Sequence, residues 1–190
     1  MLNKEFYLQD TVTIAKELIG ATFVRKFGNE IISGRIVETE AYLSTNDEAS
    51  HSSRGITKRN SAMFESGGIL YVYLIYGIHH CINVVTESKD IGSAVLIRAL
   101  EPIAGIDLMK ENRNENNVLK LCKGPANLTK ALGFNLIHNF SSLTTENLYI
   151  LPKMNDVSIS TSERIGINKS KYLQLRFFET GSAFVSTNKR

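Results

Sequence analysis

The stretch RIVETEAY, residues 35–42, decides how the rest of this chain is organised. Its apolar and polar positions suit an extended strand, and the two-residue repeat of a strand places Ile36, Glu38, Glu40 and Tyr42 on one face. Two carboxylates and an aromatic ring therefore share a surface. In isolation, such a segment is more often a half-buried strand whose acids face solvent. The surrounding segments decide between these two interpretations.

The residues before this stretch predict a helix and a partner strand. Asp10 suits the N-cap of a helix over residues 11–19, which ends at Gly20. Residues 21–27 then lead to a Gly-Asn turn, and residues 31–43 return. We therefore predict a β-hairpin that contains RIVETEAY.

Residues 43–62 are polar and show no periodicity, which is typical of a loop. They carry His51, Arg54, Lys58 and Arg59. A loop of this length inside a compact domain often has a function, although composition alone fits a solvated surface excursion equally well.

Two β-rich runs follow and meet at Gly77. Alternation places Tyr71 and Tyr73 on one face and Tyr76 on the other, so we expect Tyr73 and Tyr76 to serve different surfaces. Tyr76 lies near the predicted hairpin tip, where little core is available to it. An exposed apolar wedge is one means of separating stacked bases. An aromatic packed beneath a neighbouring loop is the alternative.

The second of these strands argues against a metal site. Alternation puts His79, Cys81 and Asn83 on one face and His80 on the other, so the adjacent His-His-Cys cannot converge on an ion. Two distant cysteines, Cys81 and Cys122, suit a reduced intracellular protein better than a disulfide framework.

Residues 94–102 predict a buried strand that carries Arg98 within an apolar run. An unpaired buried charge is unfavourable, so Arg98 needs a partner, and Glu38 or Glu40 is available. The pair could be structural, or it could hold a reacting water.

The remainder predicts short peripheral elements. We expect a helix within residues 103–111, a loop over 112–117, and a helix over 124–134 that has Pro125 near its start. The free amides beside Gly124 suit a phosphate. Strands are expected at residues 147–151, 172–178 and 183–186, with 164–167 as a connector.

Composition places further bounds on the chain. It has 190 residues with 43% hydrophobic content, which suits one compact domain over residues 1–190. A net charge of +3 permits a polyanionic partner without requiring one. No signal core or membrane-spanning run is present, so we expect a soluble intracellular protein.

The assembled motifs resemble the alkyladenine family of DNA glycosylases, the 3-methyladenine excision enzymes of the mammalian type. The resemblance runs along nearly the whole chain and rests on these segments: RIVETEAY, ASH followed by SRG, T-x-RN at 57–60, MF, YVYLIYG, C-x-N at 81–83, VLIRALEP, GP before L-x-x-AL, RIGI, RFF and VS.

The resemblance implies a role for each matching residue. Glu40 would be the general base that activates water, and Arg98 would help to hold that water. Asn83 would obstruct the exocyclic amine of guanine. Three aromatic side chains would enclose the flipped base: Tyr42, His51 and Tyr73. The DNA-contacting set would be Tyr76, which replaces the extruded nucleotide, together with Ile78, His79, Arg54, Thr57 and Arg59.

The resemblance also implies a fold and an activity. The fold would be one mixed α+β domain around a curved antiparallel sheet, with peripheral helices and a protruding β-hairpin. The activity would be monofunctional excision of alkylated or deaminated purines from damaged double-stranded DNA by a monomer that uses no metal and no cofactor. The location would be cytoplasmic and nucleoid-associated in a bacterium, or nuclear in a eukaryote.

Three connector positions depart from the family pattern. They are ESGG after MF, Lys58 and Gln174, where proline is common. They bear on loop geometry and substrate range more than on the reaction. A non-catalytic DNA-binding module and a metal-dependent hydrolase are the alternatives. The intact Glu40 and Arg98 argue against the first, and the His and Cys spacing argues against the second.

Overall fold

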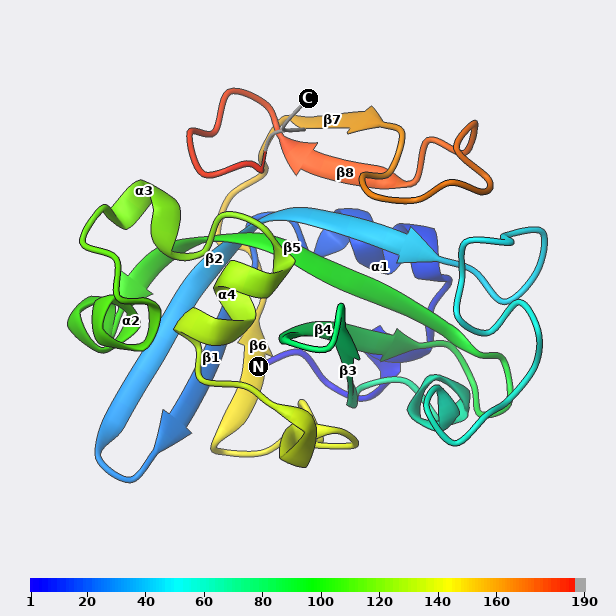
Figure 1. Ribbon diagram of the computed structural model, residues 1–190, viewed down its shortest axis with the longest axis horizontal. Helices are drawn as coiled ribbons and strands as arrows, with labels where there is room; N and C mark the ends of the chain where they lie inside the picture. The colour runs from blue at the N-terminus through cyan, green and yellow to red at the C-terminus, as the bar shows by residue number, and fades with distance from the viewer. Residues whose placement is uncertain (187–190) are drawn as a thin grey trace.

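A computed structural model describes residues 1–186 of this chain. It shows an antiparallel eight-stranded sheet whose main path runs β3-β4-β5-β2-β1-β6, with β8 pairing to β2 and β7 pairing to β8 (Figure 1). The strands are β1 (Thr22–Phe27), β2 (Glu30–Tyr42), β3 (Leu70–Ile75), β4 (His79–Thr86), β5 (Ser93–Ala104), β6 (Leu148–Leu151), β7 (Ile159–Ser162) and β8 (Arg176–Glu179).

The long strand β2 contains RIVETEAY and organises the sheet, since it pairs with β1, β5 and β8. The turn into it from β1 uses Gly28 at φ +58°, a left-handed conformation that favours glycine. Its pairing with β5 is irregular, because Glu38 lies opposite Ala99 and Thr39 lies opposite Ile97. Arg98 therefore falls in a bulge, and bulges redirect side chains.

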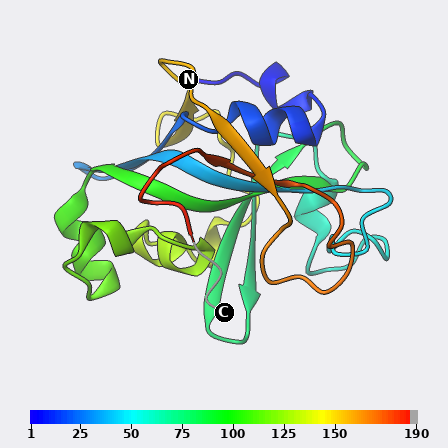
Figure 2. The ribbon, with the colours of Figure 1, turned by 90° about the horizontal axis from the view of Figure 1, so that it is seen from above.

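The helices cover both faces of the central strands. Helix α1 (Thr11–Glu17) lies on one side of β2 and β5, and the helices after β5 lie on the other (Figure 2). The Asp10 side chain accepts a hydrogen bond from the Thr13 amide, as expected of an N-cap. The later helices are α2 (Ile106–Arg113), α3 (Val118–Leu121) and α4 (Pro125–Ala131), and the short 3-10 turns are Glu5–Leu8, Ser61–Phe64 and Leu136–His138.

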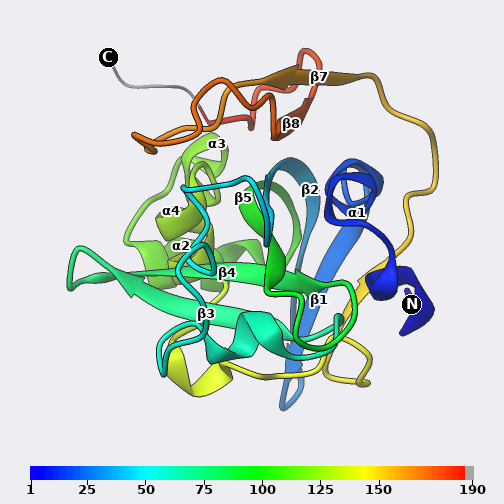
Figure 3. The ribbon, with the colours of Figure 1, turned by 90° about the vertical axis from the view of Figure 1, so that its right-hand side faces the viewer.

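The β3–β4 hairpin projects from the body of the molecule (Figure 3). Its tip residues have little to pack against, because Tyr76 is 82% exposed and Ile78 is 73% exposed. The base of the hairpin is anchored instead, since Leu70, Val72 and Ile82 are buried in the main core.

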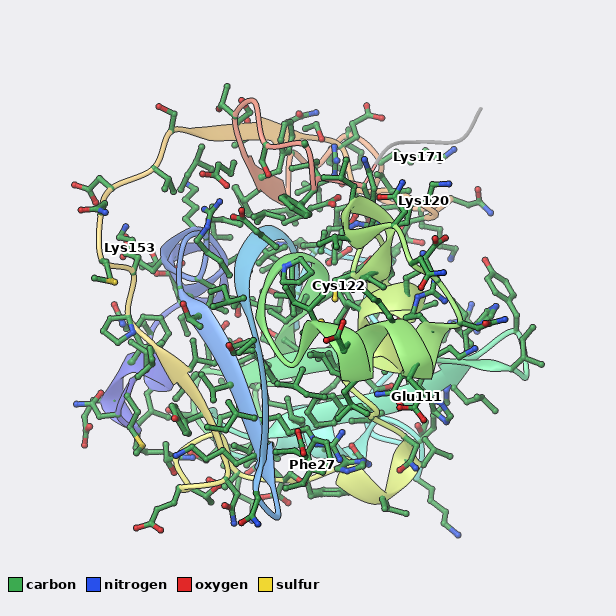
Figure 4. All side chains as sticks on the ribbon, turned by 90° about the vertical axis from the view of Figure 1, so that its left-hand side faces the viewer. Phe27, Glu111, Lys120, Cys122, Lys153 and Lys171 are labelled. Carbon is green, nitrogen blue, oxygen red and sulfur yellow. The ribbon has the colours of Figure 1, made fainter. Side chains whose placement is uncertain are left out.

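The hydrophobic core joins helices from both sides of the sheet. It includes Ile14 and Ala15 of α1, Ile97 of β5, and Leu128 of α4, all fully buried. Cys122 also lies in the interior, whereas the labelled lysines lie at the surface (Figure 4). Both cysteines are buried and free of disulfides. No helix within residues 1–186 is long and apolar enough to cross a membrane.

The structure confirms the predicted α+β class, the antiparallel sheet, the peripheral helices and the projecting hairpin. The strand predicted at 183–186 is wrong, because these residues form no ladder, and β8 begins only at Arg176 rather than at 172. Strand β7 and helix α3 were not predicted. The last four residues of the domain predicted over 1–190 lie outside the described part.

Candidate active site

A cavity of about 600 Å³ opens between the hairpin, the start of α4 and the segment 165–169. Tyr42 and Arg98 line the cavity. Glu40 lies behind them, where it accepts a hydrogen bond from Tyr42 and forms an ion pair with Arg98. The lining residues from the hairpin are Tyr71, Tyr73, Ile75, Tyr76, His79, Cys81 and Asn83. This volume is in the range of small-molecule sites.

Glu40 is fully buried and held by three groups. Its Oε1 accepts from the Ile165 amide at 2.7 Å and faces Arg98 Nη1 at 3.1 Å. Among residues 1–186, its Oε2 accepts from the Tyr42 hydroxyl alone, at 2.9 Å. Glu40, Tyr42 and Arg98 therefore meet as the sequence predicted. The alternation expected from residue 36 is interrupted, because the register shifts between Ile36 and Glu38 and Ile36 lies in the core.

Burial is the largest influence on the pKa values of Glu40 and Tyr42. It raises the pKa of Glu40, although Arg98, the Ile165 amide and the Tyr42 hydroxyl oppose the rise. A carboxylate with a raised pKa is a stronger proton acceptor. Burial, followed by the Glu40 charge, raises the pKa of Tyr42 well above its usual value, so its hydroxyl stays protonated and donates to Glu40.

Arg98 is shared between both acids of RIVETEAY. Its Nε donates to Glu38 Oε1 at 2.9 Å and its Nη2 donates to Ser186 Oγ at 3.3 Å. Glu38 also accepts from Arg176 Nε at 2.7 Å, and from Ser186 through its amide at 2.7 Å and its hydroxyl at 2.8 Å. The sequence allows either Glu38 or Glu40 as the partner of Arg98, and the structure shows both.

The predicted aromatic walls surround the cavity. His51 and Tyr73 pack edge to face, with ring centroids 4.6 Å apart, and His51 Nδ1 is 2.9 Å from the Tyr71 hydroxyl. Burial, followed by Arg59, lowers the pKa of His51, so the imidazole is neutral at pH 7. Asn83 is buried and its amide donates to the Tyr71 carbonyl.

The hairpin tip forms one rim of the cavity. Tyr76 adopts a left-handed turn conformation at φ +53°, which ends the strand alternation at Ile75. Tyr76 therefore lines the same cavity as Tyr73, and the expectation that they serve different surfaces is wrong. The exposed side chains of Ile78 and His79 lie beside it along the chain.

The long loop carries the other predicted DNA contacts. Arg54, Thr57 and Arg59 are exposed, and Arg59 donates to the Leu74 carbonyl at 2.9 Å. Asn60 organises this loop, since its amide donates to the carbonyls of His51 and Gly55 and its oxygen accepts from Thr57. The DNA contacts remain predictions, as does phosphate binding at Gly124, which lines the cavity.

Sequence reasoning missed a buried group behind Tyr42. Asp47 and Arg164 form an ion pair there, and Ile165 supplies the amide on Glu40. The RIGI motif at 164–167 marks this segment, but its sequence pattern predicts only a connector. Lys169 at the cavity edge was also missed, and its ammonium pairs with Glu48.

Comparison with known proteins covers nearly the whole chain. The model of the methylpurine-DNA glycosylase family matches residues 5–183. Three relatives are provisionally named 3-methyladenine DNA glycosylases. One from Chlorobium phaeovibrioides is 44% identical, with 97% of this chain and 96% of that protein covered. One from Francisella tularensis is 48% identical over 93% of each. One from Methanoculleus marisnigri is 46% identical over 95% and 96%.

Proposed function

Because this chain belongs to the methylpurine-DNA glycosylase family, it is a DNA glycosylase, and we propose that it flips alkylated or deaminated purines out of duplex DNA and hydrolyses their N-glycosidic bond. The substrates proposed are 3-methyladenine, 7-methylguanine, hypoxanthine and ethenoadenine. Extrusion is required because the bond is inaccessible inside the base stack.

The arrangement of donors around Glu40 is the observation that carries this proposal. Within the described part of the chain, two donors contact Oε1, whereas Oε2 accepts a single hydrogen bond, from Tyr42. Glu40 is inaccessible to solvent as the side chains stand, so a water that donates to Oε2 would have to enter from the cavity past the residues that shield it. Arg98 makes one contact through each nitrogen, and a guanidinium has five N–H donors, so donors remain to orient that water.

The proposed reaction needs one water. Its oxygen bonds to C1′ of the flipped nucleotide while Glu40 accepts its proton, and the bond from C1′ to the base nitrogen breaks with its electron pair going to the base. An alkylated purine carrying a positive charge leaves as a neutral base. A neutral purine such as hypoxanthine must gain a proton from another source. The products are free base and an abasic site.

The cavity walls suit a charged purine. Stacking a cationic base on tyrosine rings contributes roughly 0.5 to 2 kcal/mol. Tyr42 and Tyr73 supply such rings, and the neutral His51 adds no opposing charge. We assign Asn83 the task of obstructing the exocyclic amine of normal guanine.

The hairpin supplies the proposed means of extrusion. Tyr76 and Ile78 present apolar groups at a projecting tip, where they can enter the gap that the flipped nucleotide leaves. Arg54, Thr57, Arg59 and His79 would contact the backbone beside it. Damaged double-stranded DNA is thus the proposed partner.

Single-turnover excision from matched duplexes tests the proposal. Duplexes that differ only in one base would carry hypoxanthine, ethenoadenine or a methylated purine, with chelator present. We expect wild type to release free base and Glu40→Gln to bind the same duplexes without releasing it. Full activity in Glu40→Gln would remove its assigned role, and absence of release by wild type would favour a non-catalytic reader.

The same reactions test whether the enzyme also cleaves the abasic strand. A lyase forms a Schiff base with an amine, and within residues 1–186 Lys169 is the lysine that lines the cavity. Its ammonium is paired with Glu48 at the surface. We therefore expect no borohydride-trapped adduct and no strand cleavage by wild type, whereas either product would show a bifunctional enzyme.

A further inference from the structure

A fully buried ion pair between Asp47 and Arg164 lies beside the cavity, behind Tyr42. Both side chains are inaccessible to solvent, and two parallel contacts of 2.7 Å join the guanidinium to the carboxylate. Bidentate pairs of this kind have a strongly preferred geometry. The pair takes no part in the proposed reaction, so its position needs another explanation.

Arg164 also contacts the end of β2. Its Nη1 donates to the Ala41 carbonyl at 2.9 Å, and its guanidinium carbon lies 4.6 Å from the centre of the Tyr42 ring. One face of that ring is therefore occupied by Arg164, so a flipped base can stack only on the other face.

Asp47 holds the loop that leads to His51. Its carboxylate accepts from the amides of Leu43 at 3.0 Å and Ala49 at 3.2 Å. Ile165, which follows Arg164 in the chain, donates its amide to Glu40. The ion pair thus connects three parts of the site: the Tyr42 wall, the His51 loop and the amide on Glu40.

We propose that Asp47 and Arg164 are positioning residues whose mutual charge neutralisation sets how well the cavity accepts a cationic base relative to a neutral one. An arginine behind Tyr42 without its carboxylate would repel a cation stacked on the opposite face, and a carboxylate without its arginine would attract it. The neutral pair leaves the attraction of the ring for cations intact.

The test measures single-turnover release from duplexes containing cationic 3-methyladenine or neutral hypoxanthine and compares the ratio of the two rates. This inference rests on the proposed function. Asp47→Asn leaves an uncompensated guanidinium, so the ratio should fall roughly three- to tenfold. Arg164→Gln leaves an uncompensated carboxylate, so the ratio should rise.

The rate ratio is expected to change in opposite directions in Asp47→Asn and Arg164→Gln, and this distinguishes an electrostatic role from a structural one. A purely structural pair would slow both substrates equally in both variants, and that result would overturn the proposal. Because removing one partner of a buried pair destabilises a protein, thermal unfolding accompanies each variant, and either single variant that folds is enough to test the sign.

Two further variants complete the experiment. Arg164→Lys keeps the charge but loses the planar stacking and bidentate contacts, so both rates should fall while the ratio stays at the wild-type value. Glu48→Gln removes the adjacent acid, which is exposed and screened by solvent, and should leave the ratio unchanged. If wild type releases neither base, the proposed function fails, whereas release with an unchanged ratio in Asp47→Asn and Arg164→Gln refutes only this inference.

Discussion

The role proposed for Glu40 requires an ionised carboxylate in a place that disfavours ionisation. Burial raises its pKa above the usual 4.5, and the three groups that contact it only partly oppose this effect. A group whose pKa is raised on folding stabilises the protein in its protonated form. That stabilisation is present below the unfolded pKa and is lost as pH rises through the folded value.

We therefore expect the free energy of unfolding of Glu40→Gln at pH 7 to equal or exceed that of wild type. Glutamine resembles the protonated acid, so the difference should shrink as pH falls below 4.5. Denaturant unfolding at pH 7 and pH 4 measures this. Glu38→Gln is the matched comparison and should lose about 3 to 5 kcal/mol at pH 7, because Arg98 and Arg176 share that carboxylate. A large loss in Glu40→Gln at pH 7 would contradict the prediction.

The rate of excision should depend on the same group. Release of 3-methyladenine needs ionised Glu40 and no added proton on the base, so its single-turnover rate should fall as pH falls through a midpoint above 4.5. The Tyr42 hydrogen bond lowers the pKa of Glu40, so Tyr42→Phe should move the midpoint to higher pH. A wild-type midpoint at or below 4.5 would show that another group controls the rate.

At the scale of elements, the β3–β4 hairpin combines a rigid base with an exposed tip. Its base is buried in the main core, and its turn holds Tyr76 at φ +53° and Gly77 at φ +74°. A left-handed tyrosine is uncommon and mildly strained. Since Tyr76 gains little burial there, a function for the exposed ring would explain its presence.

Tyr76→Ala should therefore leave stability within about 0.5 kcal/mol of wild type, because little of the ring is buried. Excision of hypoxanthine should slow, since a neutral base gains no cation–π attraction in the cavity and depends more on the wedge for extrusion. Met154→Ala is the control, because Met154 is 95% exposed and its neighbour Lys153 lies on the opposite side from the hairpin in Figure 4. Equal rates in the two variants would remove the wedge assignment.

Local patterns account for the parts of the fold that were predicted. The Asp10 cap, the Gly28 turn and the hairpin at Gly77 depend on a few adjacent residues, and all three appear in the structure. The meeting of Glu40, Tyr42 and Arg98 followed from strand periodicity and from the need to pair a buried charge.

Long-range contacts explain what was missed. The bulge at Arg98 depends on the register between β2 and β5, which alternation within one strand does not reveal. Asp47 and Arg164 are 117 positions apart, so nothing local links them. Residues 183–186 are apolar enough to suggest a strand, yet Ser186 bonds to side chains instead of joining a ladder.

At the scale of the whole molecule, side chains from segments far apart in the sequence converge on Glu38. Arg98 comes from β5, Arg176 from β8, and Ser186 from the segment after β8. Ser186 uses its amide and hydroxyl on Glu38, and its carbonyl accepts from Arg176. The end of the described chain therefore helps to fix the arginine that faces Glu40.

Ser186→Ala should reveal how strongly the contacts between Ser186 and Glu38 support catalysis. The variant loses one hydroxyl that contacts Glu38 and Arg98, and a hydrogen bond to a charged group contributes about 1.5 to 3 kcal/mol. Unfolding free energy should fall by that amount, and excision should slow because Arg98 is less firmly held. Ser182→Ala is the control, since its hydroxyl contacts only the Phe184 amide among the described residues. If both variants match in stability and rate, the Ser186 hydroxyl contributes nothing to the site, and the two carboxylates of Glu38 and Glu40 are enough to orient Arg98.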